Sequence, residues 1–225
     1  MDSDDEILDQ TFSYLTLRKT IGWISILLPF VLMLGKFLIS KGIFIYNSIS
    51  HYYYSEMRDI FVGAICAIAL FLFFYKGYNK WDNWAGNLAG IFAIGIALFP
   101  TAEKGAYNWV ADVHLICASS FFLILAVFSL VLFTLKDPDH TKQKRIRNKI
   151  YIVCGSVMIV CLISIVIFVK FYEDEYPESS FVFWAESFAL IAFGVSWLTK
   201  GGTICPDKEA GNITESEKII SNIKQ

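Results

Sequence analysis

Long blocks of apolar sequence that carry almost no charge constrain this chain more than any other feature. A helix needs about 20 apolar residues to cross the roughly 30 Å hydrocarbon core of a bilayer. Six segments of the 225-residue chain approach that length, at 21–39, 60–75, 84–99, 110–135, 150–169 and 181–198. They are apolar all round, as expected for helices that face lipid or are wholly buried. The chain is therefore expected to form an all-α, polytopic transmembrane helical bundle of about six spans.

Composition agrees with this fold class and argues against a soluble domain. Hydrophobic residues make up 56% of the chain and charged residues 18%, whereas soluble domains carry about 25% charged residues. The formal net charge is −2, so the chain lacks the basic field that gathers nucleic acid. No nucleic-acid partner is expected.

The distribution of basic residues predicts the orientation of the spans. Lys and Arg are retained in short cytoplasmic loops. With six spans and both termini in the cytoplasm, fourteen of the 19 Lys and Arg residues fall on the inner side and five on the outer side. We expect an acidic cytoplasmic tail at 1–19, a six-span domain at 20–199 and a polar cytoplasmic tail at 200–225. The expected location is the plasma (inner) membrane.

A ribbon of small residues runs along the third apolar segment. It consists of Ala85, Ala89, Ala93 and Ala97, with Gly86 and Gly90 beside them. Small residues on one face let helix backbones approach closely where lipid gives no hydrophobic drive to associate. The ribbon predicts a buried contact between helices.

Polar side chains gather at the outer ends of the segments. The first outer loop and the start of the second segment contribute Ser50, His51, Arg58 and Asp59. Farther along the chain, His114 lies about one turn inside the fourth segment and Glu186 about 7 Å inside the sixth. An ionisable group inside a span is costly unless it is paired or faces water, so such groups mark an interior site. The predicted topology puts these residues in one leaflet, where they could line an outward-facing pocket.

Simpler roles are open for two of these residues. Asp59 could cap the outer N-terminus of its helix and oppose the positive end of the helix dipole. His114 could be a buried neutral imidazole with a satisfied hydrogen bond.

Three functions are compatible with such a pocket, and no catalytic residue is identified. The leading hypothesis is the binding of a lipid headgroup or small polar ligand in membrane lipid homeostasis. An alternative is a metal-dependent lipid hydrolase or transferase that uses His51, Asp59, His114 and Glu186. Its cofactor would be zinc, bound by His51, His114 and Glu186 with an open position, although the chain has no HExxH or other paired-ligand motif. The third is small-solute transport. The expected partners are membrane lipids and a second copy of the chain.

Short motifs in the middle of the chain resemble known membrane proteins. Ser48-Ile-Ser-His, Arg58-Asp-Ile-Phe-Val-Gly, Asn87 and the Val113-His114 pair before Cys-Ala-Ser-Ser-Phe-Phe resemble segments of uncharacterised bacterial six-span proteins. More distantly, Ile49-Ser50 and residues 114–118 are similar to motifs of the family of damage-regulated autophagy modulators, FGF-receptor-activating protein and Sfk. That resemblance, over about residues 47–133, implies six spans and a role in membrane lipid organisation, lipid-anchor remodelling, autophagy or recruitment of lipid kinases. A fainter similarity to seven-span alkaline ceramidase-type zinc hydrolases implies Ser, Asp and His chemistry, but this chain has Glu186 in place of their final paired His.

The orientation can be tested by cysteine accessibility. A cysteine introduced at Glu175, in the acidic last outer loop, should react with a membrane-impermeant thiol reagent added to intact cells. A cysteine introduced at Gln143, in the basic inner loop, should react only after the cells are opened. The reverse pattern would invert the predicted topology.

Overall fold

The computed structural model describes residues 3–40, 45–75, 77, 80–103, 108–134 and 142–206, with side chains from Leu15 onward. These residues form six long helices and two short helical turns, with no strand in the ranges described. The helices are α1 (Ser3–Ile39), α2 (Arg58–Phe74), α3 (Lys80–Leu98), α4 (Trp109–Val127), α5 (Lys142–Phe171) and α6 (Phe181–Lys200). The short turns are η1 (Ser50–Tyr54) and η2 (Phe128–Leu132), a π-helical continuation of α4. The all-α prediction is confirmed. Each predicted apolar segment overlaps a different long helix, and the segment at 110–135 also includes η2.

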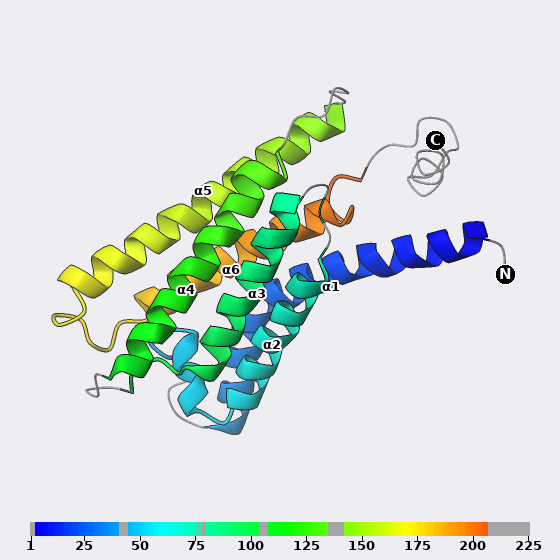
Figure 1. The fold of residues 1–225 in the computed structure, drawn as a ribbon. Coiled ribbons are helices and arrows are strands. Elements are labelled where there is room, and N and C mark those ends of the chain that lie inside the picture. Colours follow the sequence, from blue (N-terminus) through cyan, green and yellow to red (C-terminus); the bar gives the residue numbers. More distant parts are fainter. Residues whose placement is uncertain are drawn as a thin grey trace.

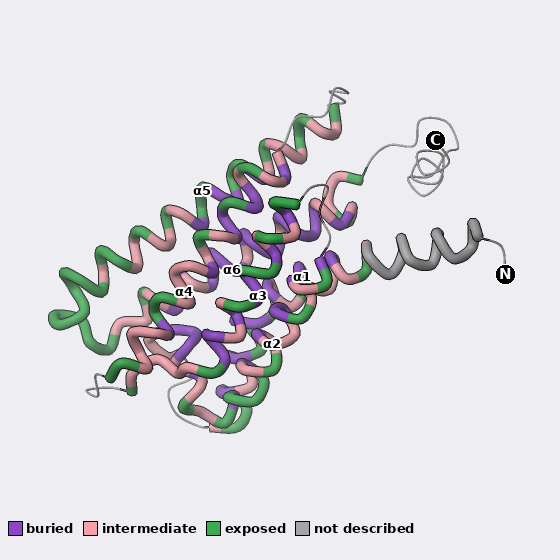
Figure 2. The backbone as a smooth tube through the Cα atoms, in the orientation of Figure 1, coloured by how far each residue is buried: buried purple, intermediate pink, exposed green. Residues whose placement is uncertain are grey.

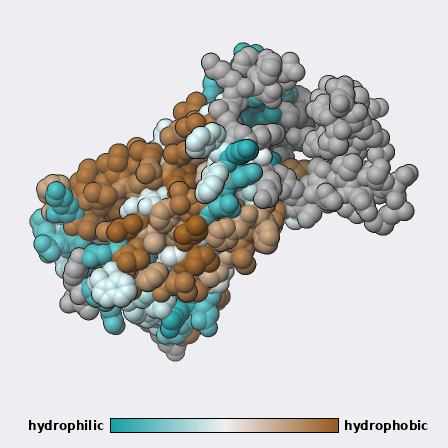
Figure 3. Space-filling view, in the orientation of Figure 1, coloured by the Kyte–Doolittle hydropathy of each residue, from teal (hydrophilic) through white to brown (hydrophobic). Residues whose placement is uncertain are grey.

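Within the described residues, four helical segments are long and apolar enough to cross a membrane. They are Leu15–Ile39, Trp109–Leu132, Lys142–Phe171 and Phe181–Lys200. The chain is therefore an integral membrane protein with several candidate spans. With 17 residues, α2 is about 26 Å long, which is shorter than the hydrocarbon core. Figure 3 shows apolar surface over the middle of the molecule and hydrophilic surface toward its end at the lower left.

The six helices form a closed ring. Helices that follow one another in the chain pack together from α1 to α6, and α6 also packs against α1. The ring has two distinct ends (Figure 1): η1 lies at one, with the starts of α2, α4 and α6, and the end of α6 lies at the other. The short helices α2 and α3 pack against longer helical segments of the ring: α2 against α1, and α3 against α4 with its η2 continuation.

Aromatic side chains fill the interior of the ring. The Trp197 ring centroid lies 4.9 Å from that of Tyr75, 5.8 Å from that of Phe128 and 5.7 Å from that of Phe193, all edge to face. Buried positions follow the inner sides of the helices along the bundle (Figure 2). The π-helical turn keeps Ser129 in this interior, where its hydroxyl shares a 2.7 Å hydrogen bond with Ser196. The interior is thus apolar and aromatic, and the polar groups of these two serines satisfy each other.

The small-residue ribbon of α3 lies at a buried contact, as predicted. Ala89, Ala93 and Ala97 are buried. A Cβ atom added at Gly86 would lie 2.9 Å from the backbone oxygen of Leu72 in α2. The absence of a side chain at Gly86 therefore lets α2 and α3 approach closely.

The N-terminal tail predicted at 1–19 is helical where the structure describes it. Residues 3–19 belong to α1, which begins at Ser3 and continues without interruption into the first apolar segment. Glycine and proline are absent between Ser3 and Thr20, so nothing in this stretch breaks the helix. Residues 207–225 of the predicted C-terminal tail lie outside the described residues.

The close contact between α2 and α3 predicts opposite effects for two matched substitutions. Gly86→Ala should destabilise the protein by about 1 to 3 kcal/mol, because the Leu72 backbone cannot move aside as a flexible side chain could. Gly63→Ala, in α2, has no atom within 4 Å of the added Cβ, and should stabilise its helix by up to about 1 kcal/mol. Thermal unfolding of the purified proteins in detergent measures both. Equal melting temperatures for the two variants would contradict this packing.

Candidate functional site

Residues 47–57, which we call the plug, close one end of the ring. Ser48, Ser50 and Tyr52 are buried there. Asn47 fixes the start of the plug to the region of α6: its carbonyl oxygen accepts the Phe183 N–H at 2.8 Å, and its side-chain amide donates to the Pro177 carbonyl at 2.5 Å. The plug is mostly not α-helical, so its backbone groups need partners from the surrounding helices.

Glu186 of α6 supplies one of these partners. Its Oε2 atom accepts the backbone N–H of Ile49 at 2.6 Å. A carboxyl oxygen can accept this hydrogen bond whether the acid is ionised or protonated. Glu186 thereby holds the turn at 49–50 against α6.

His114 of α4 holds the same turn from another side. Its Nδ1 lies 2.7 Å from the Phe99 carbonyl oxygen and its Nε2 lies 3.0 Å from the Ser50 hydroxyl. A carbonyl can only accept, so Nδ1 carries the proton, and in the neutral ring Nε2 accepts from Ser50. The Phe99 carbonyl therefore fixes the tautomer and orientation of a buried imidazole that points at a serine hydroxyl.

His51 makes a separate, local contact within the plug. Its Nδ1 lies 2.6 Å from the Ser48 hydroxyl, and its backbone N–H donates to the same hydroxyl at 3.2 Å. His51 is half-buried. Its imidazole is thus anchored by Ser48, a residue that sequence reasoning did not assign to the site.

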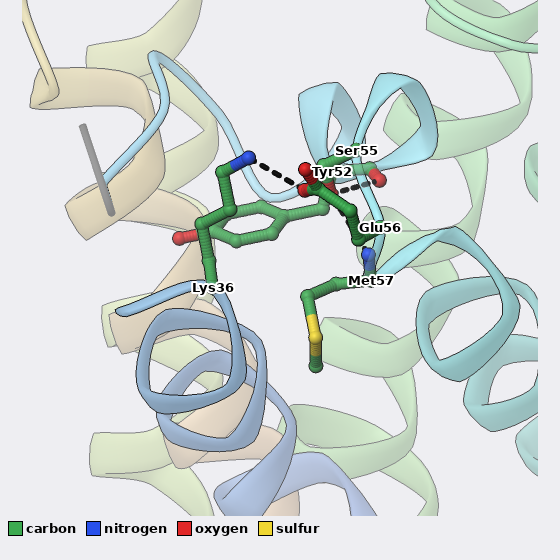
Figure 4. Close-up of polar contacts among 5 residues, drawn as sticks. All are labelled: Lys36, Tyr52, Ser55, Glu56 and Met57. Atoms are coloured by element: carbon green, nitrogen blue, oxygen red, sulfur yellow. Dashed lines mark hydrogen bonds and ion pairs between the residues drawn. The ribbon is translucent and has the colours of Figure 1, made fainter. Parts of the chain in front are cut away.

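An ion pair joins the end of the plug to α1. Lys36 Nζ donates to Glu56 Oε2 at 2.6 Å (Figure 4). This hydrogen bond holds the pKa of Glu56 below its ordinary value. In the same part of the plug, Met57 packs on α1 so closely that a Cβ atom at Gly35 would clash with its thioether. Burial raises the pKa of Tyr52, whose ring lies beside Lys36 in Figure 4, to about 12, so this phenol is neutral at physiological pH.

Arg58 and Asp59 lie at the exposed edge of the plug, in the first turn of α2. The Arg58 guanidinium donates to the Tyr53 hydroxyl at 2.5 Å and lies 4.1 Å from the centroid of the same ring. Tyr54 ties this edge to the α3–α4 connection by donating to the Thr101 carbonyl at 2.7 Å. Arg58 is therefore a positioned, accessible cation at the plug end of the ring.

The structure brings some of the predicted site residues into contact and leaves others apart. The Ser50 hydroxyl is hydrogen-bonded to the His114 imidazole, and Glu186 accepts the backbone N–H of Ile49, the residue before Ser50. His51 and Arg58 have separate partners within the plug. Among the described residues, no group of three or more His, Cys, Asp and Glu side chains could hold a metal ion. His51, His114 and Glu186 are thus not gathered as one ligand set.

An apolar groove runs from the plug end between α1 and α6. Pro29, Phe30 and Met33 line its α1 side. Its α6 side is lined by Phe183, Trp184, Ser187, Phe188 and Ile191. Pro29 lies inside α1 and removes one backbone donor from that helix. The groove was not predicted, because it depends on the contact between the first and last helices of the chain.

Comparison with known proteins finds no relative of this chain. No family model matches the chain, and neither a curated protein nor a solved structure does so. The family resemblances drawn from the short motifs remain predictions.

The Lys36–Glu56 pair predicts a pH-dependent contribution to stability. The pKa of Glu56 in the folded protein lies below its ordinary value of 4.5. The pair therefore stabilises the fold above pH 4.5, and this contribution disappears as the pH falls through the lowered pKa. Glu56→Gln should lower the melting temperature in detergent at pH 7, and the difference from the parent should vanish in acid.

Lys36→Met should have the same effect, and the double variant should melt like either single variant. Because Glu56 is exposed, a small shift is expected. A difference that persists unchanged at acidic pH would mean that the pair does not cause it.

Proposed function

We propose that the plug end binds the polar headgroup of a membrane lipid, or a small polar ligand of similar chemistry, in membrane lipid homeostasis. The observation that carries this proposal is the convergence of Ser50, His114 and Glu186, from three separate elements, on one turn of the plug. Each of these polar groups costs free energy to bury in a bundle whose interior is largely apolar. Their convergence therefore marks a site instead of ordinary packing.

The proposed topology puts this network at headgroup depth. In this topology all six helices span the bilayer. The short helices α2 and α3 reach across it with the help of the residues at their ends and of packing against longer neighbours. Both termini are cytoplasmic, as the excess of inner basic residues favours. The plug then lies at the outer leaflet.

The groove between α1 and α6 supports a lipid over a water-soluble ligand. It is lined by apolar side chains and begins at Phe183, whose N–H is bonded to the plug. One turn farther along α6 is Ser187, next to Glu186 in sequence. An acyl chain in this groove would leave its headgroup beside the plug, at the start of α6.

A second candidate function is acyl hydrolysis or transfer on a membrane lipid. It is favoured by the 3.0 Å contact of Ser50 with an imidazole that a backbone carbonyl orients, the relation of a nucleophile to its general base. In this reaction the Ser50 oxygen would attack an ester carbonyl while its proton passes to His114 Nε2. The imidazolium would then protonate the departing alkoxide, and water would later release the acyl group. Transport, by contrast, would need a polar path through the aromatic interior around Trp197.

Native mass spectrometry of the protein in nanodiscs tests the binding site. The discs contain equal amounts of phosphatidylethanolamine and phosphatidylglycerol, and retained lipids are counted after release. Glu186→Gln keeps an oxygen that can accept the Ile49 N–H but removes the charge, so the variant should fold and retain about tenfold less lipid. His114→Ala should behave in the same way. Glu175→Gln, an exposed acid in the loop before α6, is the matched control and should retain lipid like the parent.

The same nanodiscs distinguish binding from catalysis. If Ser50 is a nucleophile, the parent will release fatty acid or form an acylated product, and Ser50→Ala will bind lipid without forming either. If the site only binds lipid, no product will form with any variant. Unchanged lipid retention by both Glu186→Gln and His114→Ala would refute the proposed site.

A further inference from the structure

A contact between two glycines closes the apolar groove between α1 and α6 at the end farther from the plug. A Cβ atom added at Gly22 of α1 would lie 2.9 Å from the backbone oxygen of Gly194 in α6, and one added at Gly194 would lie 2.6 Å from that of Gly22. The two backbones touch at this level, which leaves no room for a ligand between them. We call this the glycine contact. It lies three residues beyond Ile191, the last residue of α6 that lines the groove.

The other end of the groove reaches the plug. Phe183 lines the groove there, its N–H donates to the Asn47 carbonyl, and its ring centroid lies 6.0 Å from that of Tyr52. From Phe183 to Ile191 the groove follows α6 for about 12 Å. The hydrocarbon of one leaflet is about 15 Å deep. The groove is therefore long enough to hold most of the depth of one acyl chain.

The groove opens onto a surface that lipid covers. Phe30, Trp184 and Phe188 line the groove and are exposed. They belong to Leu15–Ile39 and Phe181–Lys200, two of the segments that are long and apolar enough to cross a membrane. Large apolar side chains exposed on such segments face lipid chains in a bilayer. The groove is thus continuous with the lipid-facing surface, and an acyl chain is the occupant that it fits.

We propose that the groove binds one acyl chain of the lipid whose headgroup lies at the plug, and that the glycine contact limits how much of that chain is bound. The inference rests on the lipid-binding function proposed above and adds chain length as a determinant of specificity. Lipid tails are as apolar as the groove, so binding comes from close packing against both helices and not from a hydrophobic gain.

The glycine contact predicts how retention depends on chain length. A chain shorter than the groove leaves part of it without packing contacts. The end of a longer chain meets the glycine contact and turns out into the bilayer, where it gains no further contact with the protein. Retention should therefore increase with chain length until the groove is filled and then stay constant.

Ile191 controls the usable length of the groove. It lines the groove nearest the glycine contact on α6, so Ile191→Trp fills that end and shortens the space for a chain. Leu27→Trp is the matched control. Leu27 lies on α1 near the level of the glycine contact, but it is exposed and does not line the groove.

Native mass spectrometry of the protein in nanodiscs measures the chain-length profile. The parent, Ile191→Trp and Leu27→Trp are placed in discs of long-chain phosphatidylcholine that contain one guest phosphatidylethanolamine at a fixed low fraction. The guests carry two decanoyl, lauroyl, myristoyl or palmitoyl chains, and the retained guest is counted for each protein.

The parent and Leu27→Trp should give the same profile, which rises with chain length and then levels off. Ile191→Trp should level off at a shorter chain and retain the palmitoyl guest about fivefold less than the parent, because it loses the contacts at the end of the groove. Ile191→Phe, a smaller change, should shift the profile in the same direction. It decides the question if the tryptophan variant does not fold.

Equal retention of all four guests by the parent would overturn the chain site, as would a parent-like profile for the Ile191 variants. Glu186→Gln acts at the headgroup and should lower the retention of every guest by the same factor. If Glu186→Gln causes this loss but no protein shows a dependence on chain length, the plug-end site stands and the chain site is refuted. If the parent retains none of the guests, both proposals fail.

Discussion

The hydrogen bond from the Ile49 N–H to the Glu186 carboxylate is the interaction on which the plug end of this protein depends. Buried backbone outside the α-helices needs hydrogen-bond partners from other parts of the protein. Glu186 meets this requirement from α6, and the bond fixes the turn that carries Ser50. Ser50 can then reach His114, which the Phe99 carbonyl orients. The carboxylate thus has a structural role and a potential ligand-binding role at once.

Closure of the ring explains how short helices can belong to a membrane bundle. α2 and α3 pack through Gly86 and its neighbours, where the backbones approach too closely for a side chain. Each also contacts a longer helix on its other side, and α6 closes the ring against α1. Lipid provides no hydrophobic drive for helices to associate, so close packing and interhelical hydrogen bonds such as Ser129–Ser196 hold the ring together.

The sequence predicted the helices far better than their contacts. Length and hydropathy are local properties of the sequence, so the positions of all six long helices could be predicted from the apolar segments. The four-residue spacing of Ala89, Ala93 and Ala97 identified a buried face of α3. The contact between α1 and α6, which creates the groove, leaves no local pattern. For the site, topology grouped Ser50, His114 and Glu186 at one end, but it could not show that Glu186 binds backbone or that His51 pairs with Ser48.

Because α6 runs from one end of the ring to the other, it decides which substitutions can test one end alone. Glu186 and Lys200 lie on this one helix, about 21 Å apart along its axis, and most residues between them are buried. A substitution that displaces α6 would therefore disturb the plug end and the opposite end of the ring together. Ser50 and His114 belong to other elements at the plug end, so changes at these two residues test the chemistry of that end without altering the sequence of α6.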